Sequence, residues 1–132
     1  MDVDKKNSVL IVDDDSSVLL ELNEILKSEY KIHAVKDGMS ALEKANEYAP
    51  DLILLDVVMP DMNGFDVFAE LRRSEKTKEI PIIFITGDRK EGSKRKGMAI
   101  GAADYIRKPF SAVDVKIRVS QQIRIVNFLR DS

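Results

Sequence analysis

Four residues that follow short apolar runs carry side chains suited to the chemistry of a phosphoryl group. Asp13, Asp56, Thr86 and Lys108 each stand at or just beyond the end of such a run. Carboxylates gathered at one place repel each other, and a hard divalent cation relieves that repulsion; Mg²⁺ is usually held by a few carboxylates and water. An ammonium group and a hydroxyl complete a set that can neutralise and orient a phosphoryl group in transit.

The central carboxylate is the best candidate for the phosphoryl acceptor. Asp56 follows the third apolar run, which the pattern predicts to be the middle strand of a sheet. Asp13 and Asp14 follow the first run and are predicted to hold the metal. Thr86 would donate a hydrogen bond to the phosphoryl group and Lys108 would supply a mobile positive charge.

Each of these residues also has an ordinary structural explanation. Asp15 or Ser16 could simply cap a helix. Lys108 alone could be a solvated lysine, Thr86 a strand residue, and His33 is better explained as a strand side chain than as a ligand. The functional interpretation depends on the concurrence of compatible groups at four strand ends.

Two apolar periodicities alternate along the chain. Runs that are apolar at nearly every position, typical of strands covered on both faces, lie at residues 9–12, 32–35, 52–55, 82–85 and 105–106. Segments with helical character lie at residues 18–26, 41–48, 67–71, 90–100 and 112–129. Five strands alternating with five helices predict an α/β domain with a doubly wound parallel sheet and helices on both faces. The carboxyl ends of the strands then meet at one rim, where such folds place their sites.

Composition narrows the class of protein. A chain of 132 residues is long enough for one domain. The net charge of −2 argues against direct nucleic-acid binding, and the absence of Cys with a single His excludes disulfide scaffolds, thiol enzymes and multi-His metal sites. The apolar runs are too short to cross a membrane, and Met1 is followed by Asp2 and Asp4 without an apolar segment, so we expect a cytoplasmic protein.

The ordered set of motifs resembles the receiver domain of two-component response regulators, over residues 8–128. The matching stretches are VLIVDDD at 9–15, DLILLD at 51–56, MP at 59–60, NG at 63–64, PIIFITG at 81–87 and GAADYIRKPF at 101–110. The resemblance implies a flavodoxin-like strand order of 2-1-3-4-5. It also implies a phosphorylation-dependent signalling switch that is not an enzyme, beyond catalysing its own phosphorylation and dephosphorylation.

The resemblance implies a role for each motif residue. Asp56 would be the phosphoacceptor, with Mg²⁺ held by Asp13, Asp14, Asp56 and the backbone carbonyl of Val58. Thr86 and Tyr105 would be the coupled switch pair, and Lys108 would pair with the phosphoryl group. The backbone of Val58 and Gly87 would contact the phosphoryl group, and the Lys108–Pro109 bond should be cis.

The resemblance also implies partners. The phosphoryl donor would be a sensor histidine kinase or a histidine phosphotransfer domain, and the effector would be fused or separate. We expect residues 1–132 to be one domain, either a stand-alone receiver or the N-terminal module of a larger regulator. Phosphorylation would promote a two-fold dimer through the fourth helix, fifth strand and fifth helix, with Val113 and Ile117 in contact. Its charged residues would pair across the two-fold as Lys94 with Asp114 and Asp104 with Arg118.

Two departures and two alternatives accompany this interpretation. Val58 and Asp88 flank the path of attacking water, and the segment at 90–100 is a poor helix because it contains Gly92 and Gly97.

A phosphohydrolase of the haloacid-dehalogenase type would need a second Asp two residues after the nucleophile, where this chain has Val58. A flavodoxin-like nucleotide carrier would not place three acidic residues in its phosphate loop.

Overall fold

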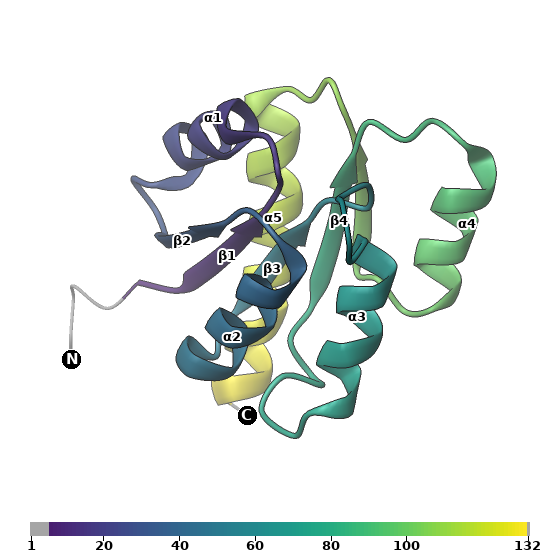
Figure 1. Ribbon diagram of the computed structural model, residues 1–132. Helices are drawn as coiled ribbons and strands as arrows, with labels where there is room; N and C mark the ends of the chain where they lie inside the picture. Colours follow the sequence, from purple (N-terminus) through teal and green to yellow (C-terminus); the bar gives the residue numbers. More distant parts are fainter. Residues whose placement is uncertain (1–5, 132) are drawn as a thin grey trace.

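Residues 6–131 are described by the computed structural model, which contains a five-stranded parallel sheet with helices on both faces (Figure 1). The strands are β1 (Ser8–Val12), β2 (Lys31–Val35), β3 (Leu52–Leu55), β4 (Ile82–Thr86) and β5 (Asp104–Arg107). The helices are α1 (Ser16–Leu26), α2 (Gly38–Tyr48), α3 (Gly64–Arg73), α4 (Glu91–Ala99) and α5 (Ala112–Asp131). The strand order is β2-β1-β3-β4-β5, and all neighbouring pairs are parallel. The predicted fold and strand order are confirmed.

The sheet separates two apolar clusters. Leu10 and Val12 of β1 face α2 and α3, whereas Val9 and Ile11 of the same strand face α1 and α5. The three central strands, β1, β3 and β4, are therefore buried on both faces, which explains why their sequences are apolar at nearly every position. Within residues 6–131, no helix is long and apolar enough to span a membrane. The prediction that no apolar segment follows Met1 concerns Asp2 and Asp4, which lie outside the described residues.

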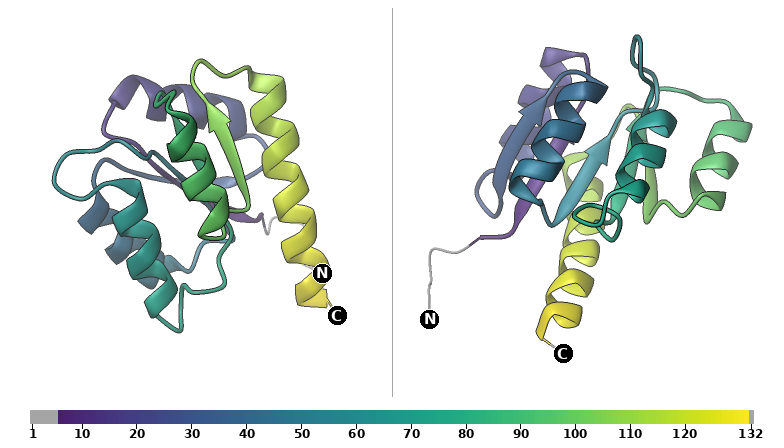
Figure 2. Two further views of the ribbon diagram at one scale, coloured as in Figure 1. Left: turned by 90° about the vertical axis from the view of Figure 1, so that its right-hand side faces the viewer. Right: turned by 60° about the horizontal axis from the view of Figure 1, so that its bottom comes forward.

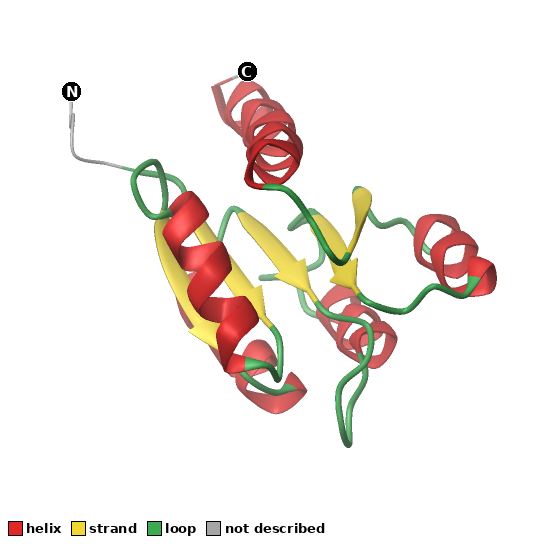
Figure 3. Cartoon of the chain, turned by 90° about the horizontal axis from the view of Figure 1, so that it is seen from above, coloured by secondary structure: helices red, strands yellow, loops and turns green. Residues whose placement is uncertain are grey.

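Side-chain caps start helices α1 and α3, which leave the carboxyl rim of the sheet; this rim faces the viewer in Figure 3. Asp15 caps α1 by accepting from the backbone N–H of Ser17 at 2.9 Å, so the ordinary explanation offered for Asp15 is correct. At α3, Asn63 accepts from the N–H of Asp66, and the Asp66 carboxylate accepts in return from the N–H of Asn63. These caps fix the loops that follow β1 and β3.

Helix α4 is held less firmly than the other helices. It lies at the edge of the molecule beside β5 (Figures 1 and 2), and Gly97 is its one buried residue. A Cβ at Gly97 would lie 3.0 Å from Cδ2 of Phe84 and 3.5 Å from Cδ2 of Tyr105. Gly97 thus lets α4 approach the sheet closely, whereas the sequence alone indicated only its cost as a helix breaker.

The C-terminal end of α5 is bonded to the rim formed by the amino ends of the strands, and Figure 2 shows the helix extending past this rim. Asp51 accepts hydrogen bonds from the backbone N–H of Ser8 and the side chain of Asn7, and it forms an ion pair with Arg130. Asn127 completes the network through its own bond to Asn7 at 2.9 Å. Nothing in the sequence alone indicated this anchor.

Two glycines should respond in opposite ways to substitution by alanine. A Cβ at Gly64 would lie 2.3 Å from the backbone oxygen of Asp56, so Gly64→Ala must displace the loop after β3. We expect it to lower the free energy of unfolding by at least about 2 kcal/mol. Gly92→Ala meets no atom within 4 Å and should stabilise the protein by about 0.5–1 kcal/mol. Urea unfolding of both variants checks this, and equal stability of Gly64→Ala and the wild type would contradict it.

Candidate functional site

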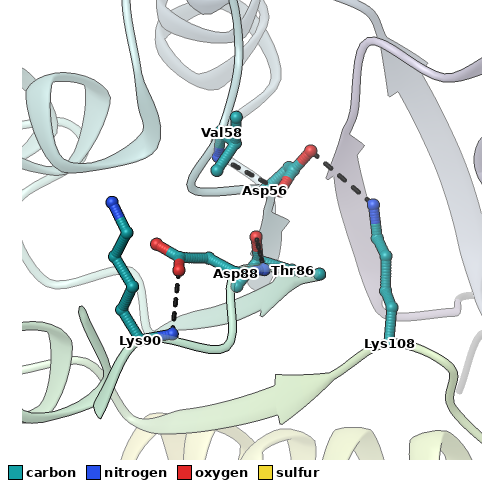
Figure 4. A pocket seen from close by; sticks show the side chains of 7 residues that line it. Asp56, Val58, Thr86, Asp88, Lys90 and Lys108 are labelled. Atoms are coloured by element: carbon teal, nitrogen blue, oxygen red, sulfur yellow. Dashed lines mark hydrogen bonds and ion pairs between the residues drawn. The ribbon is translucent and has the colours of Figure 1, made fainter. Parts of the chain in front are cut away.

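Two buried carboxylates and one lysine form the centre of the carboxyl rim. Asp13 is 1% exposed and Asp56 is 4% exposed, although the two lie 43 residues apart in sequence. Nζ of Lys108 lies 2.7 Å from Oδ2 of Asp13 and 3.6 Å from Oδ2 of Asp56 (Figure 4 shows the latter contact). The peptide bond that follows this lysine, Lys108–Pro109, is cis, as expected. The parallel topology has brought together the residues that the sequence placed at strand ends.

The acidic cluster fits a hard divalent cation. Asp13, Asp14 and Asp56 each offer a carboxylate oxygen, and these three atoms all lie within 4.8 Å of one another. At a separation of 4.8 Å, two unit charges repel by about 3.5 kcal/mol at an effective dielectric near 20. Asp14 is exposed while the other two are buried, so a cation here would keep access to water, as Mg²⁺ requires.

The charges at this rim shift the pKa values of Asp56 and Lys108. Burial and the neighbouring charge of Asp13 raise the pKa of Asp56, although Lys108 and the N–H of Val58 oppose this. Burial lowers the pKa of Lys108, but its hydrogen bond to Asp13 and the charge of Asp56 outweigh burial and leave that pKa raised. Lys108 is thus held as a cation, and its positive charge stabilises the ionised form of the neighbouring Asp56 carboxylate.

An open cleft of about 480 Å³ lies over Asp56 and is large enough for a phosphoryl group. Thr86 forms part of its wall and is fully buried, whereas Val58 is 58% exposed at the rim. A Cβ at Gly87 would meet no atom within 4 Å, which agrees with the expected room beside the acceptor. The residues that line the cleft are Asp56, Val58, Thr86, Gly87, Asp88, Lys90 and Lys108.

Tyr105, the expected partner of Thr86 in the switch pair, is turned inward in this structure. Its side chain is already buried, at 5% exposure, with its ring centroid 6.3 Å from that of Phe84. The space beside Gly97 accommodates the ring in this state. The Tyr105 hydroxyl is buried without a hydrogen-bond partner in the described part of the chain. The inward position therefore does not have to be created by phosphorylation.

The four charged residues of the expected dimer face do not all lie free on the surface. Arg118 donates to Asp104 at 2.7 Å and to Asp114 at 3.0 and 3.1 Å within the chain. These hydrogen bonds raise the pKa of Arg118. Lys94 is exposed on α4. Contacts between two chains would therefore have to share or replace these internal ion pairs.

One residue has a larger structural role than the sequence indicated. Asp88 was singled out as a neighbour of attacking water, but it also accepts from the backbone N–H of Lys90 and the hydroxyl of Ser93. The available signal was an Asp two residues before Lys90, the N-cap residue of α4, whose own side chain makes no capping bond.

Fold and site together define a class of protein. A doubly wound α/β domain with an acidic cluster, a partly buried lysine and a buried hydroxyl at the carboxyl rim has the architecture of a domain that handles phosphoryl groups. Residues 9–120 match the response regulator receiver domain, and the chain belongs to this family. The phosphohydrolase and nucleotide-carrier alternatives are thereby set aside.

Curated relatives share this domain within longer proteins. The alkaline phosphatase synthesis transcriptional regulatory protein PhoP of Bacillus subtilis is 39% identical over 118 residues, which are 88% of this chain and 48% of PhoP. The "Probable cyclic di-GMP phosphodiesterase" of Vibrio cholerae is 37% identical over 117 residues, 89% of this chain and 26% of that protein. The chain therefore spans half or less of the length of these two relatives. The activities in their names belong to the longer proteins.

Solved structures agree in fold. The chemotaxis protein CheY4 of Vibrio cholerae matches with a TM-score of 0.81 and 31% identity, covering 90% of this chain and 99% of that one. The receiver domain of sensor histidine kinase PA1611 of Pseudomonas aeruginosa matches with a TM-score of 0.82 and 27% identity, covering 90% and 98%, and has a magnesium ion in its active-site cleft.

Membership of the family fixes the coarse function. The chain is a phosphorylation-dependent signalling switch of a two-component system. Receiver domains bind Mg²⁺ at an acidic pocket and interact with histidine kinases.

Proposed function

We propose that Asp56 is the phosphoacceptor of this receiver domain. The observation that carries the proposal is the convergence of Asp13, Asp56 and Lys108 at one rim, with Nζ of Lys108 within 4 Å of both carboxylates. Asp56 lies at the base of the open cleft, whereas Asp13 already accepts from Lys108 and from the backbone N–H of Asp15. Asp56 is therefore the carboxylate that is both central and open to a donor.

The reaction is an in-line displacement at phosphorus. A carboxylate oxygen of Asp56 forms the new P–O bond, and the bond from phosphorus to the donor atom breaks, with the leaving group keeping the electron pair. The donor is a phosphohistidine of a kinase or a phosphotransfer domain, or a small acyl phosphate. Lys108 would pair with the phosphoryl oxygens, and the backbone N–H groups of Val58 and Gly87, two residues that line the cleft, would orient them.

Mg²⁺ would be held by Asp13, Asp14, Asp56 and the backbone carbonyl of Val58. When bound, it would supply positive charge against the charge that develops on the transferring group. The protein's own contribution is to hold two of these carboxylates buried and close together before the donor arrives. Apart from promoting its own phosphorylation and dephosphorylation, the domain has no proposed catalytic activity.

Phosphorylation by acetyl phosphate tests this assignment. In the presence of Mg²⁺ the intact mass should increase by one phosphoryl group, and chelation of Mg²⁺ should prevent the increase. The Asp56→Asn variant has the same size but no carboxylate nucleophile, so it should not be modified. Modification of Asp56→Asn at the wild-type rate would refute the proposal.

Thr86 is proposed to report the phosphoryl group to the output face. Its hydroxyl would turn toward a phosphoryl oxygen, and differential contacts of this kind are what shift a conformational equilibrium. Tyr105 would respond from its buried position, where its hydroxyl has no partner among the described residues. The output face consists of α4, β5 and α5, and an effector, fused or separate, would read it.

An activated homodimer through this output face is a further prediction. Lys94 would pair with Asp114, and Asp104 with Arg118, across a two-fold that repeats each contact. Exposed pairs contribute only about 0.2–1 kcal/mol each, so the exposed Val113 and Ile117 must add apolar contact. With beryllofluoride, Lys94→Asp should weaken the dimer and added Asp114→Lys should restore it, measured by light scattering. A protein that stays monomeric at high concentration would contradict this interface.

A further inference from the structure

The first turn of α4 is capped by a residue that lies outside the helix. The N-cap residue is Lys90, whose side chain can only donate and makes no capping bond. Asp88 accepts instead: Oδ1 takes the backbone N–H of Lys90 at 3.0 Å, and Oδ2 takes the hydroxyl of Ser93 at 2.5 Å. Figure 4 shows this carboxylate turned back toward the Lys90 nitrogen. The cap of α4 is therefore part of the loop that leaves the phosphoryl cleft.

The backbone of the same residue contacts the switch hydroxyl. The N–H of Asp88 donates to Oγ1 of Thr86 at 3.2 Å, a bond also drawn in Figure 4. Gly87 lies between them, and a Cβ at this position would meet no atom within 4 Å, so there is open space beside this turn on that side. Asp88 thus touches Thr86 through its backbone and α4 through its side chain.

Helix α2 provides an internal comparison because an Asp at its start also accepts from a backbone N–H and a serine hydroxyl, although there the Asp is the N-cap residue itself. Asp37 accepts from the backbone N–H of Ser40 at 2.8 Å and from its hydroxyl at 3.2 Å. That helix is 11 residues long and also buries Gly38, Ala41 and Ala45, whereas α4 buries Gly97 alone. The position of α4 should therefore depend more strongly on its cap.

We propose that Asp88 is a positioning residue that couples the Thr86 hydroxyl to the first turn of α4. The coupling rests on the proposed role of Thr86 in reading the phosphoryl group. When that hydroxyl turns toward the phosphoryl group, the N–H of Asp88 loses its acceptor and the loop shifts. The carboxylate then releases Ser93, and the start of α4 loosens. Because linkage is reciprocal, the intact cap must also oppose the turn of Thr86.

Beryllofluoride with Mg²⁺, used as a phosphoryl analogue, tests this coupling in the whole chain. Ser93→Ala removes one capping partner but keeps the charge of Asp88 at the cleft, so any change in affinity is not a simple effect of charge. We expect Ser93→Ala to bind beryllofluoride about threefold more tightly than the wild type. Ser40→Ala, the matched control on α2, should bind with unchanged affinity. If the cap only stabilised α4, Ser93→Ala would lower the free energy of unfolding but leave the affinity for beryllofluoride unchanged.

Amide hydrogen exchange over residues 91–93 gives the second measurement. Beryllofluoride should speed exchange in the wild type, whereas Ser93→Ala should exchange quickly without it. Wild-type affinity together with a wild-type exchange response in Ser93→Ala would overturn the coupling. The proposed function fails separately if the wild type does not bind beryllofluoride, or if Thr86→Ala binds it and α4 still responds as in the wild type.

Discussion

Replacing Lys108 with methionine should slow the phosphorylation of Asp56 about a hundredfold. Nζ of Lys108 lies 2.7 Å from Asp13 and 3.6 Å from Asp56, in a position to meet the oxygens of an incoming phosphoryl group. Methionine keeps a long apolar side chain and loses only the charge and its hydrogen bonds. The rate of mass increase with acetyl phosphate and saturating Mg²⁺ measures the effect.

Lys90→Met is the matched control for this substitution. Lys90 lines the same cleft, but its ammonium group is turned away from Asp56 in Figure 4, so its loss should change the rate by about twofold or less. Binding of Mg²⁺ should persist in Lys108→Met, because the substitution removes a competing cation from Asp13. Phosphorylation of Lys108→Met at the wild-type rate would exclude the proposed role of this lysine.

Substituting Asp13 with asparagine should weaken Mg²⁺ binding at least about tenfold. The side chain is 1% exposed and shares the acidic cluster with Asp14 and Asp56, so its charge acts at close range in a poorly solvated place. Titration of Mg²⁺ followed by NMR shifts or calorimetry measures binding without reference to phosphorylation. Phosphorylation at limiting Mg²⁺ should fall in parallel.

Asp15→Asn separates a ligand effect from a loss of acidic charge. Asp15 is the third acidic residue of the same run, but its carboxylate caps α1 and is not one of the three clustered groups. Asparagine can still cap the helix, so this variant should bind Mg²⁺ within about threefold of the wild type. Equal losses in Asp13→Asn and Asp15→Asn would show that only the general negative charge matters.

The sequence was enough to predict the fold because the central strands are buried on both faces. The run Leu52–Leu55 is apolar at every position since one side of it faces α2 and α3 and the other faces α1 and α5. Strand ends could be read from the same runs, and parallel topology then placed Asp13, Asp56 and Lys108 together. Long-range convergence was predictable here because one rule of architecture governs all the strand ends.

Features that depend on local packing could not be predicted in this way. Gly97 looks like a helix breaker until the position of Phe84 beneath it is known. The burial of Tyr105 and the ion pair of Arg118 with Asp104 depend on side-chain conformations that no spacing in the sequence specifies. Asp88 could be recognised as a cap only after the start of α4 was known, because Lys90 occupies the formal N-cap position.

Chemical location of the phosphoryl group tests the central claim most directly. Borohydride reduces an acyl phosphate to an alcohol, so a phosphorylated aspartate is converted to homoserine and can be located by peptide mass. After treatment with acetyl phosphate and Mg²⁺, we expect homoserine at position 56 and unchanged aspartate at positions 13 and 14. Homoserine at position 13 or 14 with intact Asp56 would contradict the assignment of Asp56 as the phosphoacceptor.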